Sequence, residues 1–143
     1  TNDAIGSFDR LVDMNVPHYL VADAMIGSIA QRLVRKLCPR CKKEHVSTPE
    51  EMKILGLKKE EHIHEAKGCE ACNYTGYQGR TAVFEIMEMT EEVKHKLSKE
   101  KLDAEQLRVF LKEQGMYFLE DSCRELVLEG ITTISEYRTI VSS

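Results

Sequence analysis

The stretch CEACNYTGYQGR, residues 69–80, together with CPRC at residues 38–41, decides how the middle of this chain folds. Two cysteines separated by two residues can direct both sulfurs at one point. Two such pairs complete the tetrahedral shell of four thiolates that zinc takes in structural sites. Residues 42–68 separate the pairs, more than the roughly 15–20 residues of a common zinc ribbon, but a helix predicted over 49–55 accounts for the extra length. The spacing therefore predicts one zinc ion, bound by Cys38, Cys41, Cys69 and Cys72.

Other interpretations of these cysteines are weaker. Two disulfides are typical of exported proteins, and we expect no signal peptide because the first residues lack a basic start and an apolar run. A four-thiolate iron–sulfur cluster is the main rival metal site. A J-protein chaperone domain would repeat its cysteine motif four times instead of twice. The fifth cysteine, Cys123, lies on an apolar helical stripe and is predicted to be a small buried side chain.

The composition is that of a globular chain, since 42% of its 143 residues are hydrophobic and the formal net charge is only -4. Residues 32–43 nevertheless carry six basic side chains and no acid. Four thiolates on one divalent ion leave two negative charges, so Arg35, Lys36, Arg40, Lys42 and Lys43 are predicted to compensate the site. A phosphate-binding surface and a simply solvated face are the alternative interpretations. The six are Arg32, Arg35, Lys36, Arg40, Lys42 and Lys43.

Two helices around the turn NVPH, residues 15–18, are predicted for residues 4–37. The second helix ends near Cys38 because Pro39 disfavours a helical conformation in the residue before it. Its apolar residues recur at steps of three and four, which is typical of a helix that packs one face on a core. That face comprises Ile26, Ile29, Ala30, Leu33 and Leu37.

The rest of the chain shows a strand and further helices. Residues 80–88, RTAVFEIME, are apolar on both faces and rich in β-branched residues, as expected of a buried strand. Thr48, Thr90, Asp103 and Thr133 are predicted to begin helices as N-caps. The predicted fold class is therefore α+β, mainly α, with a short β segment. Its three segments are a helical segment at 1–37, a four-cysteine zinc-binding subdomain at 38–80, and a strand with C-terminal helices at 81–143.

Several stretches, in this order and spacing, resemble the C-terminal part of the hexameric ATPases of type II secretion and type IV pilus assembly. TNDA, residues 1–4, is similar to the end of that family's histidine box. Residues 8–42 resemble the helix pair that leads into the first cysteine pair, and GCEACNYTGYQGRTAVFEIMEM, residues 68–89, resembles the second pair and its strand. GMYFLED and LEGITTISEY, at 115–121 and 128–137, resemble the closing helices, although Ser122 stands where the family usually has glycine.

The resemblance implies a longer parent with a RecA-like P-loop core that uses ATP and magnesium in a homo-hexamer. The missing initial methionine also suggests a cut piece. No GxxxxGK[ST] motif is present, so this chain alone is expected not to hydrolyse ATP. Arg32 and Arg80 stand in stretches similar to family motifs, and each is a candidate for contact with a nucleotide or a neighbouring subunit. The alternative for both is an intramolecular contact that fixes the zinc lobe.

Partners and location follow from the same resemblance. It implies a cytoplasmic protein that is peripheral at the inner membrane through a platform protein of the secretion or pilus machine. No apolar run reaches the roughly 18–20 residues of a membrane span, and the net charge of -4 argues against direct nucleic-acid binding. A zinc-ribbon module that binds nucleic acid or protein is the alternative function.

Overall fold

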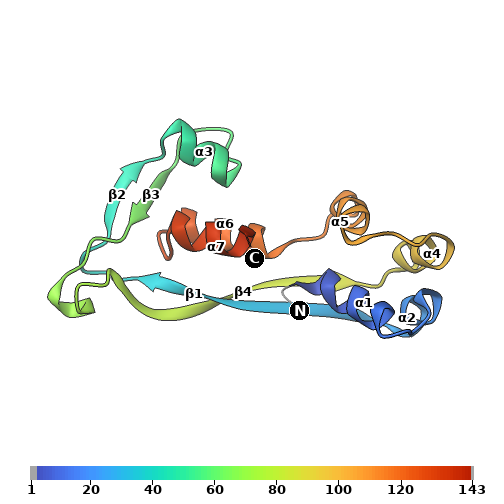
Figure 1. Cartoon of the computed structure of the whole chain (residues 1–143). Helices are drawn as coiled ribbons and strands as arrows, with labels where there is room; N and C mark the ends of the chain where they lie inside the picture. Colours follow the sequence, from blue (N-terminus) through green and yellow to red (C-terminus); the bar gives the residue numbers. More distant parts are fainter. Residues whose placement is uncertain (1–2, 143) are drawn as a thin grey trace. The chain divides into compact units, whose positions relative to one another are not determined.

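The computed structural model describes residues 3–142 and shows a mixed α/β chain (Figure 1). Thr1 and Asn2, half of the stretch TNDA, lie outside the described residues. None of the helices among the described residues is long and apolar enough to cross a bilayer. In chain order the elements are α1 (Ala4–Asp13), α2 (His18–Ala24), β1 (Gly27–Leu37), β2 (Lys43–Val46), α3 (Pro49–Leu55), β3 (His62–Glu65), the 3₁₀ turn η1 (Glu70–Cys72), β4 (Tyr77–Glu88), α4 (Glu91–Lys99), α5 (Ala104–Glu113), α6 (Leu119–Leu128) and α7 (Ile134–Ser142).

Strands β1 and β4 pair with each other and form a long two-stranded ribbon (Figure 1). At one end the backbone N–H of Met89 donates to the carbonyl of Ile26 at 3.0 Å, and at the other the N–H of Cys38 donates to the carbonyl of Gly76 at 2.9 Å. Residue numbers rise along one strand as they fall along the other, so the pair is antiparallel. The ribbon therefore ends where the two cysteine pairs begin.

The helix predicted to reach Cys38 was wrong, because α2 ends at Ala24 and residues 27–37 form strand β1. Side chains alternate along a strand, so Val34 is buried while Leu33 is 56% exposed. The three-and-four spacing that predicted a helix is also met by residues on both faces of a strand. Pairing with β4, a contact far along the chain, outweighs this local pattern. The chain is consequently mixed α/β, with a longer β segment than the sequence predicted.

The predicted helix starts are confirmed. Thr48 Oγ1 accepts from the N–H of Glu51 at 3.2 Å, and the Glu51 carboxylate accepts from the N–H of Thr48 at 2.9 Å, which completes a capping box. Asp103 forms the same arrangement with Gln106 at the start of α5. Thr90 caps α4 by accepting from the N–H of Val93. Short polar motifs of this kind act within one turn, so tertiary contacts do not override them.

The chain folds as two compact units, each made of two stretches of sequence. The first comprises residues 1–31 and 84–118, and its core is a single apolar cluster from four helices and the end of β4. Helix α2 packs on α4, and α1 packs on α5. The fully or nearly buried members are Ala4, Ile5, Phe8, Val21, Ala22, Met87, Met89, Val93, Leu97, Leu107, Leu111 and Phe118.

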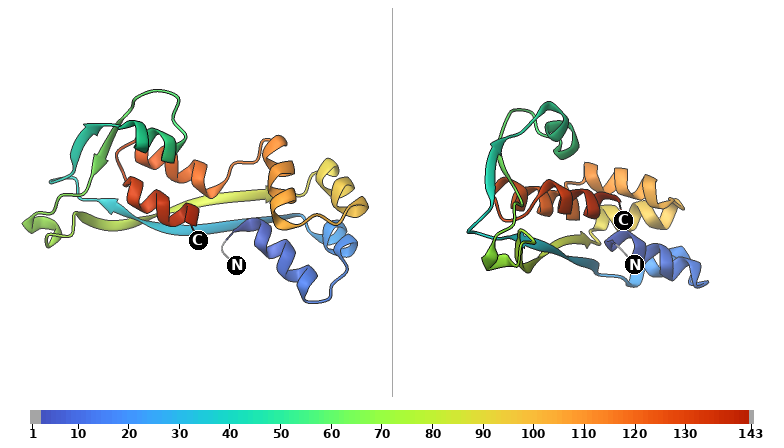
Figure 2. Two further views of the ribbon diagram at one scale, coloured as in Figure 1. Left: turned by 45° about the horizontal axis from the view of Figure 1, so that its top comes forward. Right: turned by 60° about the vertical axis from the view of Figure 1, so that its left-hand side comes forward.

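The second unit comprises residues 32–83 and 119–143 and carries all five cysteines. Strands β2 and β3 form an antiparallel hairpin in which Lys43 lies opposite Glu65 and Val46 opposite His62. Helix α3 packs on α7, α6 packs on α7, and β3 packs on α6 (Figure 2). Cys123 is fully buried on α6, as predicted, and burial raises the pKa of its thiol to about 11.

Because residues 27–37 form a strand, the neighbours Val34 and Leu33 should contribute very differently to stability. Replacing Val34, which is 1% exposed, by alanine should lower the free energy of unfolding by about 2 kcal/mol, because two buried carbons are lost and a cavity remains. Replacing its exposed neighbour Leu33 by alanine should change stability by about 0.5 kcal/mol or less. Urea unfolding of both variants measures the difference. A larger loss for Leu33→Ala than for Val34→Ala would contradict the strand.

Candidate metal centre

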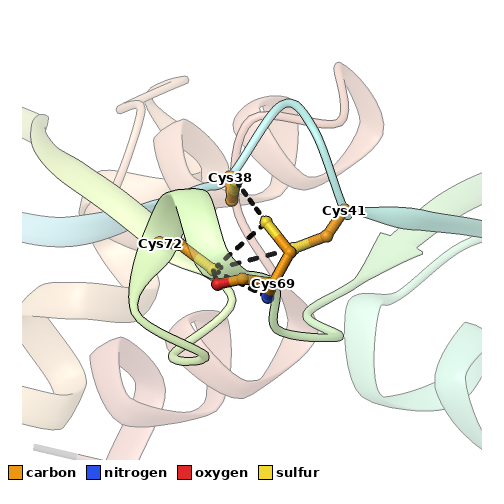
Figure 3. Close-up of side chains that lie close together, drawn as sticks. All are labelled: Cys38, Cys41, Cys69 and Cys72. Carbon is orange, nitrogen blue, oxygen red and sulfur yellow. Dashed lines mark hydrogen bonds between the residues drawn. The ribbon is translucent and has the colours of Figure 1, made fainter.

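The four cysteines of the two CxxC pairs come together at the end of the β1–β4 ribbon (Figure 3). Cys38 directly follows β1, and Cys41 closes the short turn before β2. Cys69 stands before the 3₁₀ turn η1, and Cys72 is its last residue. Each pair is held by a tight turn, since the N–H of Lys42 donates to the carbonyl of Cys38 and the N–H of Cys72 to that of Cys69.

The spacing of the sulfur atoms fits one tetrahedral ion. All four Sγ atoms lie within 4.8 Å of one another. Three separations are 3.8 Å: Cys38 to Cys69, Cys41 to Cys72, and Cys69 to Cys72. A tetrahedron with metal–sulfur distances of about 2.3 Å has edges of about 3.8 Å. The cysteines are free thiols and no disulfide joins them, so their donor set can hold a metal ion.

Backbone N–H groups are directed at two of the sulfurs. The N–H of Gly68 donates to Cys41 Sγ at 3.3 Å, and those of Cys69 and Gly76 donate to Cys72 Sγ, each at 3.2 Å. A thiolate accepts such bonds more strongly than a thiol does, because the charged acceptor strengthens the bond. The loop therefore supplies part of the compensation that four thiolates around one ion require.

These donors and burial separate the acidities of the thiols. Burial acts to raise the pKa of Cys72, but the N–H groups of Cys69 and Gly76 and the neighbouring thiols outweigh it and lower the pKa to about 6. Burial raises the pKa of Cys41 to about 11, because the single N–H donor of Gly68, which acts to lower the pKa, does not offset the effect of burial. Because the thiolate is the form that binds metal, the lowered pKa of Cys72 favours this side chain as a ligand.

Two glycines allow the second cysteine pair to fold back on the chain. Gly68 has φ +108, and a Cβ there would lie 2.8 Å from the carbonyl oxygen of Tyr74. Gly76 has φ +85, and a Cβ there would lie 2.6 Å from the Cβ of Ala66. Both glycines also use their N–H groups as donors to the sulfurs. Glycine is needed here both for the backbone conformation and for the close approach.

Two of the basic residues predicted to compensate the site make contacts with other parts of the second unit. Arg35 Nε donates to Glu136 Oε1 at 2.7 Å, and its guanidinium lies 4.0 Å from the ring centre of Tyr77. Lys42 Nζ donates to the carbonyl of Gly130 at 3.0 Å. These two side chains bind helices α6 and α7 to the cysteine-bearing segment, a role that sequence analysis did not assign to them.

Arg32 and Arg80 lie on the two strands of the ribbon. Arg32 is half-buried on the inner face of β1, and Arg80 is exposed on β4. Neither position tests a contact with a nucleotide or a subunit, so that role stays a prediction. Intramolecular contacts of the kind considered for these two arginines are also made by other residues in the second unit. Arg35 is one of them, and Arg124 is another.

Arg124 links α3 to the closing helices and was missed by sequence analysis. Its Nε donates to the carbonyl of Leu55, its Nη1 to Asp121 Oδ1 at 2.7 Å, and its Nη2 to the hydroxyl of Tyr137 at 3.2 Å. The pair Asp121 and Arg124, three residues apart on one helix, was the available signal. It did not reveal the carbonyl of Leu55, which is 69 residues away.

The sequence analysis predicted correctly that Thr133 caps α7, but it did not predict the contact that the Glu136 side chain makes. Thr133 Oγ1 accepts from the N–H of Glu136 at 3.3 Å, so Thr133 caps α7 as predicted. The Glu136 carboxylate, which a capping box would turn back to the cap, binds Arg35 instead. The hydroxyls of Tyr77 and Thr133 are 3.0 Å apart beside this pair. The ion pair raises the pKa of Arg35.

A ribbon with two CxxC turns at its end, in a mixed α/β chain, defines a protein with a four-cysteine lobe that could hold a metal ion. The model of the family described as "Type II/IV secretion system protein" matches residues 1–139. The chain belongs to this family.

Relatives are matched along almost the whole chain. The chain is 37% identical to "Type II secretion system protein E" of Pseudomonas aeruginosa over 138 residues, 95% of this chain and 27% of that protein. It is 36% identical to "Type IV pilus assembly ATPase PilB" of Thermus thermophilus, over 95% of this chain and 16% of that protein. It is 33% identical to "Type II secretion system ATPase E" of Vibrio cholerae, over 95% of this chain and 27% of that protein. The chain thus spans about a quarter or less of these relatives.

The requirement for glycine at the second cysteine pair is testable with a matched pair of variants. Gly76 and Gly79 both have positive φ, +85 and +73, but only Gly76 is crowded, since a Cβ at Gly79 would have no atom within 4 Å. Both alanine variants lose about 1 kcal/mol of stability to backbone strain. Gly76→Ala should lose about 1–3 kcal/mol more through overpacking against Ala66. Equal losses in chemical denaturation would contradict this packing argument.

Proposed function

We propose that Cys38, Cys41, Cys69 and Cys72 hold one zinc ion that ties the 38–80 segment together. The convergence of four sulfurs at tetrahedral spacing, in a chain of this family, carries the proposal. Zinc has no geometric preference of its own and is held in closed four-thiolate sites of this kind. Four protein ligands leave no position for a substrate, so the ion has a structural role and supplies no chemistry.

The sulfur spacing favours a single ion over an iron–sulfur cluster. A cluster of several irons and sulfides occupies the space between its cysteine ligands and holds their sulfurs farther apart. Here three pairs of sulfurs are 3.8 Å apart, which leaves room for one ion at the centre. A single iron would occupy the same space, and metal analysis distinguishes it from zinc.

Metal content and stability test the zinc site together. The chain purified without chelator should contain one zinc and no iron by elemental analysis. Cys72→Ser should abolish zinc binding and unfold the 38–80 segment, because binding and folding of such a lobe are coupled. Cys123→Ala is the matched control, since Cys123 is fully buried away from the site on α6. It should keep its zinc and lose only packing energy, about 1–2 kcal/mol. Iron, or no metal, in the purified chain would contradict the proposal.

We further propose that the chain is the C-terminal part of an ATPase that powers type II protein secretion or type IV pilus assembly. The family match over residues 1–139 and the names of the relatives support this. The ATP and magnesium site belongs to the longer parent, because no GxxxxGK[ST] loop is present here to hold the β- and γ-phosphates. The unit that carries the zinc site then serves as a rigid peripheral part of the ATPase that helps to assemble it.

The parent is proposed to work as a homo-hexamer in the cytoplasm, bound at the inner membrane through a platform protein of the machine. Arg32 and Arg80 are the residues of this chain proposed to contact a nucleotide or a neighbouring subunit. The exposure of Arg80 on β4 leaves its guanidinium available for such a contact. Planar guanidinium groups bind phosphate in a bidentate manner, which suits contact with a nucleotide.

Steady-state ATP hydrolysis tests this division of labour. The isolated chain should show no hydrolysis above background, while the full-length parent should hydrolyse ATP and sediment as a hexamer. In the parent, Arg80→Ala should lower the turnover number, because Arg80 is proposed to contact the nucleotide or the next subunit. Arg138→Ala removes the same charge from an exposed position on α7 and is the control, with turnover expected to stay unchanged. Turnover by the isolated chain at the rate of its parent would overturn the proposal.

A further inference from the structure

Residues 130–133, the α6–α7 turn, pack against the segment that carries the cysteines. Thr132 in this turn is fully buried, at 0% exposure. The Nζ of Lys42, the residue after the first cysteine pair, donates to the carbonyl of Gly130 at 3.0 Å. Gly130 also lies against β3, because a Cβ there would be 2.8 Å from His64 Nδ1. The turn therefore contacts the chain just after the first cysteine pair and shortly before the second.

Hydrogen bonds join the same turn to the end of β1. Thr132 Oγ1 donates to the carbonyl of Arg35 at 2.7 Å. The N–H of Leu37 donates to the carbonyl of Ile131 at 2.8 Å. The next N–H along the chain, that of Cys38, donates at 2.9 Å to a carbonyl in the loop after the second cysteine pair. Neighbouring residues of one strand end therefore hold both the α6–α7 turn and a ligand of the proposed metal centre.

We propose that zinc binding and the packing of the α6–α7 turn form one cooperative event, in which Thr132 is a positioning residue for the first cysteine pair. The proposal rests on the proposed zinc site and extends its effect to two helices that supply none of its ligands. An ion that fixes Cys38 and Cys41 also fixes the carbonyl of Arg35 and the N–H of Leu37, which the turn binds. Because such coupling is reciprocal, the packed turn raises the affinity of the cysteines for the ion.

Zinc affinity distinguishes this coupling from a turn that only adds stability. A contact that is formed equally with and without the ion stabilises both states and leaves the affinity unchanged. A contact that is formed only with the ion contributes its free energy to binding. The hydrogen bond from Thr132 to Arg35, if of ordinary strength, then changes the Kd for zinc by about 5-fold.

Matched threonine variants of the chain test the coupling. Thr132→Val removes the hydroxyl that donates to Arg35 and keeps the size of the side chain. Thr139→Val is the control, because Thr139 is exposed on α7 and its hydroxyl donates to the carbonyl of Ser135 in the same helix. Competition with a zinc-chelating dye of known affinity measures the Kd of each variant for zinc.

The two variants should differ in zinc affinity. We expect the Kd for zinc to rise about 5-fold in Thr132→Val. In Thr139→Val it should stay within about 2-fold of the native value, as for surface substitutions generally. Thr132→Ser keeps the hydroxyl donor and should restore a Kd close to the native one. A purely structural role of Thr132 would lower the stability of Thr132→Val without this change in Kd.

Amide hydrogen exchange of the unaltered chain provides a second measurement. Exchange is followed by NMR with zinc bound and again after a chelator has removed it. The N–H groups of Leu37, Ile131 and Tyr137 donate to carbonyls at or beside the turn, and they should exchange about 10-fold faster without the ion because local opening then includes the turn. The N–H of Leu107 in α5 belongs to the first unit and should keep its rate.

The outcomes separate the two proposals. Equal zinc affinity in Thr132→Val and Thr139→Val would overturn the coupling while leaving the zinc site intact. The same holds if the N–H groups of Ile131 and Tyr137 keep their exchange rates after zinc is removed, and this measurement decides the question if Thr132→Val does not fold. A chain that is purified without zinc and binds none would overturn the metal centre, and the coupling with it.

Discussion

The pairing of β1 with β4 is the interaction on which the metal centre depends. Its last hydrogen bond, from the N–H of Cys38 to the carbonyl of Gly76, joins a ligand of the first cysteine pair to the loop that follows the second. The preceding N–H, that of Leu37, donates to the carbonyl of Ile131 between α6 and α7. Backbone bonds on successive residues therefore place Cys38 against both the second cysteine pair and the C-terminal helices. The cysteines converge because the ribbon brings them together.

Side chains of the second unit then fasten the cysteine-bearing segment to α6 and α7. Thr132 Oγ1 donates to the carbonyl of Arg35 at 2.7 Å, while the guanidinium of Arg35 holds Glu136. Lys42 reaches Gly130 in the same turn, and Arg124 holds the end of α3. Such contacts to backbone carbonyls depend on position more than on charge. A metal ion at the cysteines would thus stabilise a lobe that is already oriented, which suits a structural role.

Local signals in the sequence predicted the starts of helices correctly. Thr48, Asp103 and Thr133 cap their helices as expected, because the bonds they make lie within three residues. The prediction of a helix over residues 27–37 was wrong. Val34 and Leu33 lie on opposite faces of a strand, but the apolar residues of this segment also match the helical period. Short apolar stretches satisfy both periods, and only a distant partner strand decides between them.

The four cysteines that could hold a metal ion were identifiable from the sequence itself, because a CxxC turn fixes the geometry of each pair within four residues. The crowding that requires glycine at 68 and 76 comes from Tyr74 and Ala66, which lie outside the CxxC turns themselves. What only the tertiary structure decided is how the sulfurs differ from one another. Burial of Cys38 and the N–H donors to Cys72 arise from chain segments that fold around the pairs. The exposure and the hydrogen bonding of each sulfur are properties of that packing, and the spacing of the cysteines in the sequence does not determine them.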